Sequence, residues 1–428
     1  MLKVSWFPEL LPEEKIIEEK IINIIKNTYQ KFGYTPIETP AVERNSVLTA
    51  KWWNEVSKQI FGLYGLAQWC NNDTKDYSLH FDLTVPFARY VIDHLNELNF
   101  PFKRSQIQKV WRWERAQKWR FREFYQADID VIWPSENNYS FYDAEVIFVI
   151  VNTLKEIFSY FWLNEKFKVK INHKKIISWF LTWLNLQDRL QQITTIIDKK
   201  DKMPEKKFIQ LLKEEKLSDE QIEKILKFIN TKQLSELKKL TNNNKINEWI
   251  ADLEKTIDLL KKLWLEKEIE LDFWIMRWLD YYTWIVFETF IENNRQLGSI
   301  ASGWKYENFT KFIDEKKLYS GIWGSIWLSR LESFIFEKIN KNQKTTTEYL
   351  IINFQETFDK ILDLYKKLIS EWKKVEIYPA PEKMKKQFKY ADKKWIKYCT
   401  ILWENEAKNW IYKIKDMTTG QEQEISLT

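Results

Sequence analysis

Apolar residues first recur at helical spacing near the start of the chain. Pro12 is followed by two glutamates, an arrangement typical of a helix's first turn. The following isoleucines share one side of a 3.6-residue period: Ile16, Ile17, Ile21, Ile24 and Ile25. This pattern predicts a long amphipathic helix over roughly 12–32.

Two later stretches have the shorter period of strands. PIETPAVE (36–43) is β-prone but contains Pro40, which suits an edge strand or a strand at an interface, and the pattern leaves both open. Residues 105–133 alternate charge and bulk in two arms around the basic loop AQKWR (116–120). We expect a hairpin that exposes arginines.

The composition of the chain changes at about residue 172 and again at residue 338. From about 172 to 262 it is rich in Lys, Glu and Leu at helical spacing, which predicts a helical insertion with solvated charges, contact with RNA being the alternative. After a polar linker at 338–346, strands expected at 348–354, 375–380 and 397–402 alternate with helices. Such alternation predicts a small α/β domain with parallel strands.

Length, charge and cysteine content narrow the class of protein. A chain of 428 residues is long enough for two or three domains, and 67 Lys+Arg against 61 Asp+Glu permit a polyanionic partner without requiring one. Cys70 and Cys399 form no metal-ligand spacing with the three histidines. Neither a long apolar run nor a signal-peptide pattern occurs, so we expect a cytoplasmic protein with no membrane association.

The glycine content is abnormal. The chain has 8 Gly and 23 Trp, and the two counts together come close to the roughly 30 glycines expected from an average usage of about 7%. Neighbouring tryptophans at 52–53, and tryptophans among charged residues such as Trp372, do not resemble core. Because some bacterial lineages read the UGA codon as glycine, we interpret most Trp letters as glycine. An aromatic-rich protein is the alternative.

Two strings contain arginines in sharply defined surroundings. Attack of a carboxylate on the α-phosphate of ATP brings two anions together, so such a site needs fixed cations. The first string, RWERAQKWRFREFYQADIDVI, starts at Arg112, and the second, RWLDYYTWIVFE, starts at Arg277. The first resembles motif 2 of class II aminoacyl-tRNA synthetases. The second resembles the signature of the histidyl-tRNA synthetase family, RGLDYYTGIVFE, once glycine replaces tryptophan.

This resemblance implies roles for residues of both strings. It places Arg112 at the α-phosphate and at the histidine carboxylate, and Arg277 at the α-phosphate during adenylation. A guanidinium suits both tasks because it stays charged and offers a planar fork of donors. Further roles follow by resemblance: Glu114 and Arg120 hold ATP, Phe124 stacks on adenine, and Tyr281 and Tyr282 enclose the histidine.

Further candidates for histidine binding lie upstream and within the hairpin. Asp82-Leu83-Thr84 resembles the family's amino-acid-binding strand, in which a carboxylate meets the substrate ammonium; in isolation Asp82 would be interpreted as a turn or cap residue. Gln126 and Asp130, four residues apart on one strand, should face the same side. Both offer acceptors for the N–H groups of an imidazole, which is a physical basis for selecting histidine.

Other segments extend the resemblance over nearly the whole chain. SGWKYENF (302–309) resembles a glycine-rich family element, and SGIWGSIWLSRL (320–331) resembles motif 3, which implies that Arg330 contacts the γ-phosphate. PIETP resembles motif 1 at the family's dimer interface, and the C-terminal stretch resembles the anticodon-binding domain. The sequence departs from the pattern at His80, where arginine is common, and at several Trp letters; Trp111 is the best candidate for a genuine tryptophan.

The resemblance implies an α+β protein with a class II antiparallel-sheet catalytic core. We expect a catalytic domain at 1–337 with its helical insertion at about 172–262, a linker at 338–346 and an anticodon-binding domain at 347–428. The implied activity is ligation of L-histidine to tRNA(His) by a homodimer using Mg²⁺-bound ATP, with no dedicated protein metal site. The alternatives are a non-catalytic regulatory subunit of ATP phosphoribosyltransferase and an inactive RNA-binding or structural protein whose tryptophans are real.

Overall fold

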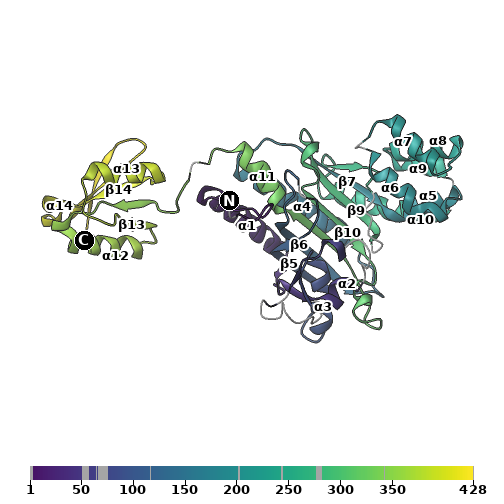
Figure 1. The fold of residues 1–428 in the computed structure, drawn as a ribbon, viewed down its shortest axis with the longest axis horizontal. Coiled ribbons are helices and arrows are strands. Elements are labelled where there is room, and N and C mark those ends of the chain that lie inside the picture. Colours follow the sequence, from purple (N-terminus) through teal and green to yellow (C-terminus); the bar gives the residue numbers. More distant parts are fainter. Residues whose placement is uncertain are drawn as a thin grey trace. The chain divides into compact units, whose positions relative to one another are not determined.

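The computed structural model describes residues 3–50, 57–63, 65, 76–115, 117–200, 203–241, 244–275, 282–341 and 343–427. The chain divides into two compact units (Figure 1). The first unit contains residues 1–8 and 22–337, and the second contains residues 9–21 and 338–428. Helix α1 (Pro12–Lys31) contributes residues to both.

An eight-stranded sheet forms the centre of the first unit. Its strand order is β1-β5-β6-β11-β10-β9-β7-β8. In that order the strands are β1 (Thr35–Pro36), β5 (Phe102–Trp111), β6 (Glu123–Pro134), β11 (Tyr319–Trp327), β10 (Ala301–Tyr306), β9 (Tyr282–Ile291), β7 (Phe167–His173) and β8 (Ile269–Leu271). Neighbours from β5 to β7 are antiparallel, and the two edge strands pair in parallel.

The two faces of this sheet differ in polarity. Ala127, Ile129 and Val131 of β6 are completely buried on the side covered by helix α4 (Phe141–Tyr160). A Cβ added at Gly324, which pairs with Ile129, would lie 2.7 Å from the Val146 side chain of α4. Because side chains alternate along a strand, the residues between them point to the opposite face, which is polar.

Smaller elements surround the sheet. A three-stranded sheet has the order β2-β4-β3. Its strands, and the nearby helices, are β2 (Val42–Arg44), β4 (Tyr77–Leu79), β3 (Gly62–Leu63), α2 (Asn45–Thr49) and α3 (Thr84–Asp93). Helix α11 (Leu328–Lys338) follows β11. Short 3-10 turns occur at Ser57–Gln59, Gln187–Arg189, Arg295–Leu297, Phe309–Phe312 and Gln355–Thr357.

Six helices lie between β7 and β8 and gather beyond the β7 end of the sheet (Figure 1). They are α5 (Lys174–Trp183), α6 (Leu190–Asp198), α7 (Glu205–Glu214), α8 (Asp219–Asn230), α9 (Leu234–Thr241) and α10 (Asn244–Lys262). Their core includes Phe180 stacked on Phe228, with ring centroids 4.2 Å apart. Ser218 and Gln221 close a capping box at the start of α8.

The second unit contains a five-stranded sheet of order β13-β12-β14-β15-β16. The strands are β13 (Val375–Ile377), β12 (Tyr349–Ile351), β14 (Tyr398–Ile401), β15 (Ile411–Asp416) and β16 (Glu422–Ser426), and the helices are α12 (Phe358–Ser370), α13 (Met384–Lys394) and α14 (Glu404–Lys408). The first three strands are parallel and the last two antiparallel. Leu350 and Ile351 lie in separate buried clusters, so both sides of β12 are covered.

The fold class predicted from the sequence is confirmed, with corrections in detail. The helix expected at 12–32 is α1, and the hairpin expected at 105–133 is β5 and β6. A single strand at 36–43 is wrong: only Thr35–Pro36 pairs with β5, and Val42–Arg44 joins the other sheet. Prolines at 36 and 40 remove amide donors and so limit pairing. The antiparallel strands β15 and β16 were not expected.

Four helices end in the same hydrogen-bonded turn, with tryptophan in a left-handed conformation. In the turn after α4, Trp162 has φ +55°; its amide bonds to Ser159 O, and the next amide bonds to Phe158 O. Trp264, Trp372 and Trp395 repeat this Schellman pattern after α10, α12 and α13. Gly33 occupies the same position after α1, with φ +76°.

Tryptophan dominates the left-handed conformations in the described part of the chain. Of ten non-glycine residues with positive φ there, seven are tryptophan: Trp6, Trp119, Trp162, Trp264, Trp372, Trp395 and Trp410. A bulky side chain in this region is a conformational outlier, whereas glycine adopts it freely. The indoles of Trp162 and Trp372 are both 94% exposed, so packing does not compensate for this backbone cost.

Candidate functional site

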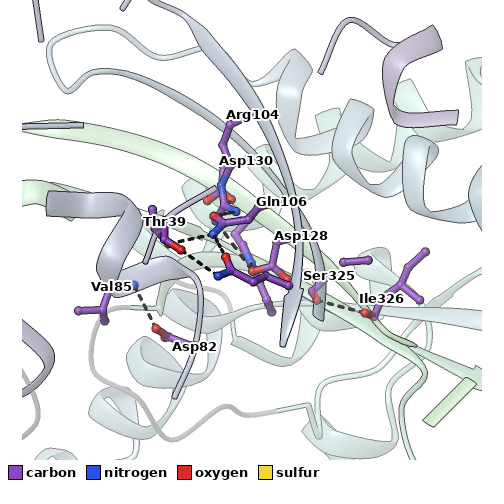
Figure 2. A network of polar contacts seen from close by, with 12 residues as sticks. Thr39, Asp82, Val85, Arg104, Gln106, Asp128, Asp130, Ser325 and Ile326 are labelled. Atoms are coloured by element: carbon purple, nitrogen blue, oxygen red, sulfur yellow. Dashed lines mark hydrogen bonds and ion pairs between the residues drawn. The ribbon is translucent and has the colours of Figure 1, made fainter. Parts of the chain in front are cut away.

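The polar face of the large sheet collects charged and amide side chains from adjacent strands. On β6 it carries Gln126, Asp128 and Asp130, and the register pairs Asp130 with Arg104 of β5. Figure 2 shows Arg104 directed at the carboxylates of Asp128 and Asp130. The prediction that Gln126 and Asp130 share a face is confirmed by this register.

Asp130 lies at the centre of this network and is completely buried. Its Oδ2 is 2.7 Å from Arg104 Nη2, and its Oδ1 accepts a hydrogen bond of 2.7 Å from the hydroxyl of Tyr306. Burial raises the pKa of Asp130 to about 7, and the charge of Arg104 acts in the opposite direction. The carboxylate therefore titrates near neutral pH.

Three buried acceptor atoms on this face lack a hydrogen-bond donor among the described residues. They are Gln126 Oε1, Asp128 Oδ1 and Asp130 Oδ2. The contact of Oδ2 with Arg104 is an ion pair whose angle does not satisfy hydrogen-bond geometry. Because buried acceptors normally have partners, we expect Gln126 and Asp130 to accept hydrogen bonds from a ligand that supplies N–H groups.

Arg112 and Asp82 place opposite charges beside this network. Arg112 donates from Nε to Phe81 O at 2.8 Å. Asp82 is nearly buried, and its pKa is raised by burial to about 6, with the Val85 amide and Arg112 lowering it. The expected strand at 82–84 is wrong: Asp82 Oδ1 accepts from the Val85 amide at 3.1 Å, and Thr84 begins α3. Leu83 and Thr84 are buried there.

The candidate ATP-binding residues Glu114, Arg120 and Phe124 lie in the same hairpin as Arg112. Its guanidinium lies 5.2 Å from the ring centroid of Phe124. Glu114 and Arg120 are 4.0 Å apart across the hairpin, and Arg120 closes its loop by exchanging backbone hydrogen bonds with Gln117. Trp119 in that loop has φ +63°. Arg112 thus contacts Phe124, and Glu114 lies near Arg120 in the same hairpin.

Arg330 lies on the first turns of α11, where the backbone meets the same sheet. It donates from Nη1 to Ser299 O, and Gly298 lies beside its guanidinium. The preceding residue, Ser329, accepts a hydrogen bond of 3.0 Å from the amide of Tyr125, the neighbour of Phe124. The Ser329 contact connects the start of α11 to the part of β6 that contains Phe124.

Three indoles cover part of this face. Trp323 and Trp327 of β11 pair with Asp130 and Gln126, and Trp304 of β10 pairs with Trp323. The ring centroids of Trp304 and Trp323 are 3.7 Å apart, and Trp323 Nε1 donates to Asp128 Oδ2 at 2.7 Å. The indoles therefore occupy space over the carboxylates that a ligand would need.

Some candidates cannot be compared with the structure. Arg277 and Tyr281 lie outside the described residues, and Tyr282 begins β9 without a described side chain. His80, the departure from the family pattern, is buried with Nε2 2.7 Å from Lys109 O, and it lies against Trp111. Burial lowers its pKa, so it is neutral near pH 7.

The sequence interpretation missed three residues of the network: Arg104, Asp128 and Tyr306. Asp128 could have been found, because it lies two residues from Asp130 in the same alternating strand. In the described ranges no cluster of three or more His, Cys, Asp or Glu side chains could hold a metal. Nor does any helix there have the length and apolarity needed to cross a bilayer.

The second unit matches a known family model. Residues 343–428 match the anticodon-binding domain. An antiparallel sheet with arginines and carboxylates on one face, followed by such a domain, defines a class II aminoacyl-tRNA synthetase. Residues 6–322 match the histidyl-tRNA synthetase model, and this chain belongs to that family.

Individual relatives agree with this assignment. The histidine–tRNA ligases of Clostridium tetani and Clostridium acetobutylicum are 37% and 35% identical, over 98% of this chain and 95% and 96% of theirs. The crystal structure of histidyl-tRNA synthetase from Nostoc sp. PCC 7120 has a TM-score of 0.87 at 32% identity, over 99% of this chain and 96% of that one. A Bacillus halodurans protein described as an ATP phosphoribosyltransferase regulatory subunit/histidyl-tRNA synthetase shares the fold at 18% identity and a TM-score of 0.74, over 90% of this chain and 96% of that one.

Proposed function

We propose that this chain joins L-histidine to tRNA(His) in two steps on the polar face of its large sheet. A carboxylate oxygen of histidine bonds to the α-phosphorus of ATP, and the bond from that phosphorus to diphosphate breaks. The terminal ribose hydroxyl of the tRNA then attacks the histidyl carbonyl, loses its proton and releases AMP. Ligation of histidine to tRNA is the activity for which the Clostridium relatives are named.

The observation that carries the choice of histidine is that Gln126 Oε1 and Asp130 Oδ2, two of the three buried acceptors on this face, lack donors among the described residues. A buried acceptor without a donor costs about 1–3 kcal/mol, so a ligand that supplies N–H groups is favoured there. Imidazole offers N–H groups in a planar ring. We assign both side chains to recognition of the substrate.

Charges beside this pair suit the reacting groups. Asp82, with a pKa of about 6, is ionised at neutral pH and can bind the substrate ammonium, while Arg112 binds its carboxylate and the α-phosphate. We assign Arg277 to the α-phosphate. The remaining roles are Leu83, Thr84, Tyr281 and Tyr282 around the histidine, and Glu114, Arg120, Phe124 and Arg330 around the ATP. Mg²⁺ enters with ATP as part of the substrate.

We further assign the catalytic domain to residues 1–337, the linker to 338–346 and the anticodon-binding domain to 347–428. The insertion spans about 172–262 of the catalytic domain. The partners are L-histidine, ATP, tRNA(His) and a second copy of the chain, in the cytoplasm. The PIETP segment, which resembles the family's interface motif, is our candidate for the contact between copies.

We also propose that most tryptophan positions are glycine in the native protein. The support is the backbone: Trp162, Trp264, Trp372 and Trp395 occupy the turn position that Gly33 occupies after α1. A non-glycine residue in the left-handed region costs about 1–2 kcal/mol. Glycine at Trp304, Trp323 and Trp327 would also clear space over the carboxylates and let a nucleotide approach the backbone.

Diphosphate exchange tests the proposed activity directly. The purified chain is incubated with ATP, labelled diphosphate and one amino acid at a time, and we expect label to enter ATP with histidine alone. Equal exchange with another amino acid would overturn the specificity. A complete lack of exchange would favour a regulatory or structural protein instead.

Mass spectrometry of the protein from its natural source tests the recoding. Peptides spanning positions 162 and 372 should have the mass of the glycine form. Peptides with tryptophan at both positions would refute the recoding, whatever the outcome of the exchange assay.

A further inference from the structure

Arg104 is a buried cation that none of the synthetase motifs identified above includes. Its side chain is completely buried in β5. Nη1 donates to Gln106 Oε1 at 2.9 Å, and the guanidinium carbon lies 4.4 Å from the ring centroid of Phe87. Gln106 is itself held by a 2.9 Å hydrogen bond to Thr39 Oγ1 (Figure 2). The orientation of Arg104 is therefore fixed on several sides.

A buried charge is expensive unless it is paired, so the partner of Arg104 shows what it stabilises. Arg104 Nη2 is 2.7 Å from Asp130 Oδ2 but 3.9 Å from Asp128 Oδ2. The nearer carboxylate is the one we assign to the imidazole. None of these contacts of Arg104 is made by a tryptophan, although Trp323 donates to the more distant carboxylate, Asp128.

We propose that Arg104 is a positioning residue for histidine: it favours the ionised form of Asp130 and fixes the carboxylate so that Oδ2 accepts the imidazole N–H. Arg104 thereby selects a substrate without contacting it. This inference rests on the proposed function, because it needs histidine to bind at Asp130.

The charges around Asp130 show why the arginine is needed. The titratable groups that act on Asp130 are Arg104 of β5, Asp128 of β6, Asp82 before α3, Tyr306 of β10 and Tyr34 after α1. Burial and the two carboxylates raise the pKa of Asp130, while Arg104 and the Tyr306 hydroxyl lower it. Loss of Arg104 would therefore leave Asp130 protonated at neutral pH, and a protonated carboxyl is a weaker acceptor.

The test compares Arg104→Met with two matched variants in the full-length chain, using the tryptophan or glycine form that shows histidine-dependent exchange. Arg104→Lys restores a charge without the planar fork. Lys103→Met removes the ion pair to Glu145 from the preceding residue, which points to the opposite face of β5. The histidine KM, the ATP KM and the maximal exchange rate are measured across the pH range, with thermal unfolding of each variant.

An opposite charge at this distance lowers a carboxyl pKa by about 1–3 units. In Arg104→Met we therefore expect the fall of 1/KM for histidine on acidification to occur at a pH about 1–3 units higher. At pH 7 the histidine KM should rise about fivefold or more, and the ratio to the unaltered chain should shrink as the pH rises. The ATP KM should change less than about twofold. The substrate histidine also titrates in this pH range, but its titration is the same for both chains and cancels in this ratio. Lys103→Met should leave the profile unchanged, and Arg104→Lys should restore most of it.

The outcomes separate the inference from the proposed function. If the unaltered chain shows no histidine-dependent exchange, the proposed function fails. If it exchanges normally but Arg104→Met has an unchanged profile, or raises both KM values equally, the positioning role is refuted. If Arg104→Met does not fold, the pH dependence of the histidine KM in Arg104→Lys provides the test. A 1/KM that falls on acidification at the same pH as in the unaltered chain supports the positioning role. A histidine KM that rises equally at every pH refutes it.

Discussion

Replacing an exposed tryptophan at a helix end should stabilise this protein. Trp162 follows α4 with φ +55° and a side chain that is 94% exposed, so the indole contributes little packing. Glycine removes the left-handed penalty of about 1–2 kcal/mol, and part of this gain is lost to the greater freedom of glycine in the unfolded chain, about 0.5–1 kcal/mol. We expect Trp162→Gly to raise the free energy of unfolding by about 1 kcal/mol.

Two control variants distinguish the effect of removing the left-handed backbone penalty from the effect of removing the indole. Trp162→Ala removes the ring but keeps Cβ, so its stability should stay within about 0.5 kcal/mol of the original. Trp111→Gly should instead destabilise the protein, because Trp111 lies in β5, donates from Nε1 to Glu123 at 2.9 Å and packs against His80. Truncation of a packed tryptophan costs up to about 3–5 kcal/mol.

Thermal unfolding provides the measurement. A gain of about 1 kcal/mol corresponds to roughly 2–4 °C in the midpoint for a domain of 150–250 residues, and somewhat less for a larger unit. Equal gains in Trp162→Gly and Trp162→Ala would show that removal of an exposed ring, and not of Cβ, is responsible. A lower midpoint for Trp162→Gly would refute the reasoning.

Four further predictions concern catalysis. Arg277→Ala should slow adenylation by about 10²–10³ without loss of fold, and a normal single-turnover rate would remove Arg277 from the mechanism. Below pH 7 the histidine KM should rise, because Asp130 and Asp82, with pKa values of about 7 and 6, lose the charges that bind the substrate; a KM that falls on acidification in diphosphate exchange would contradict this. Phe124→Ala should weaken ATP binding by about 1–3 kcal/mol with the histidine KM unchanged, and an unchanged ATP KM would exclude stacking. The chain made with glycine at every tryptophan except Trp111 should be more stable and more active than the chain made as written, by thermal unfolding and diphosphate exchange, and equal behaviour would contradict the recoding.

How far the sequence predicts this fold depends on the length of each pattern. The twenty residues of α1 and the long arms of the β5–β6 hairpin repeat their period often enough to be recognised. Strand alternation also placed Gln126 and Asp130 on one face. In contrast, the two residues of β1 contain no period, and Pro36 within the strand and Pro40 after it limit its pairing.

Arg104 could not be predicted from local pattern. Lys103 and Arg104 are adjacent basic residues in a strand, and either could face solvent. Pairing with β6 decides which one turns toward Asp130, and Asp130 lies more than twenty residues downstream of Arg104. Asp82 illustrates a different failure: its family motif was recognised, but its position before a helix depends on the chain turning into α3.

The tryptophans with positive φ, four of which end helices, have a consequence for the assignment of codons. Seven left-handed tryptophans would require seven separate substitutions if each arose by mutation, whereas one change in decoding alters every such codon at once. Under the proposed recoding, backbone dihedral angles record the meaning of a codon, because the left-handed region is costly for bulky residues. A residue letter that gathers at positive φ then indicates which codon assignment should be tested.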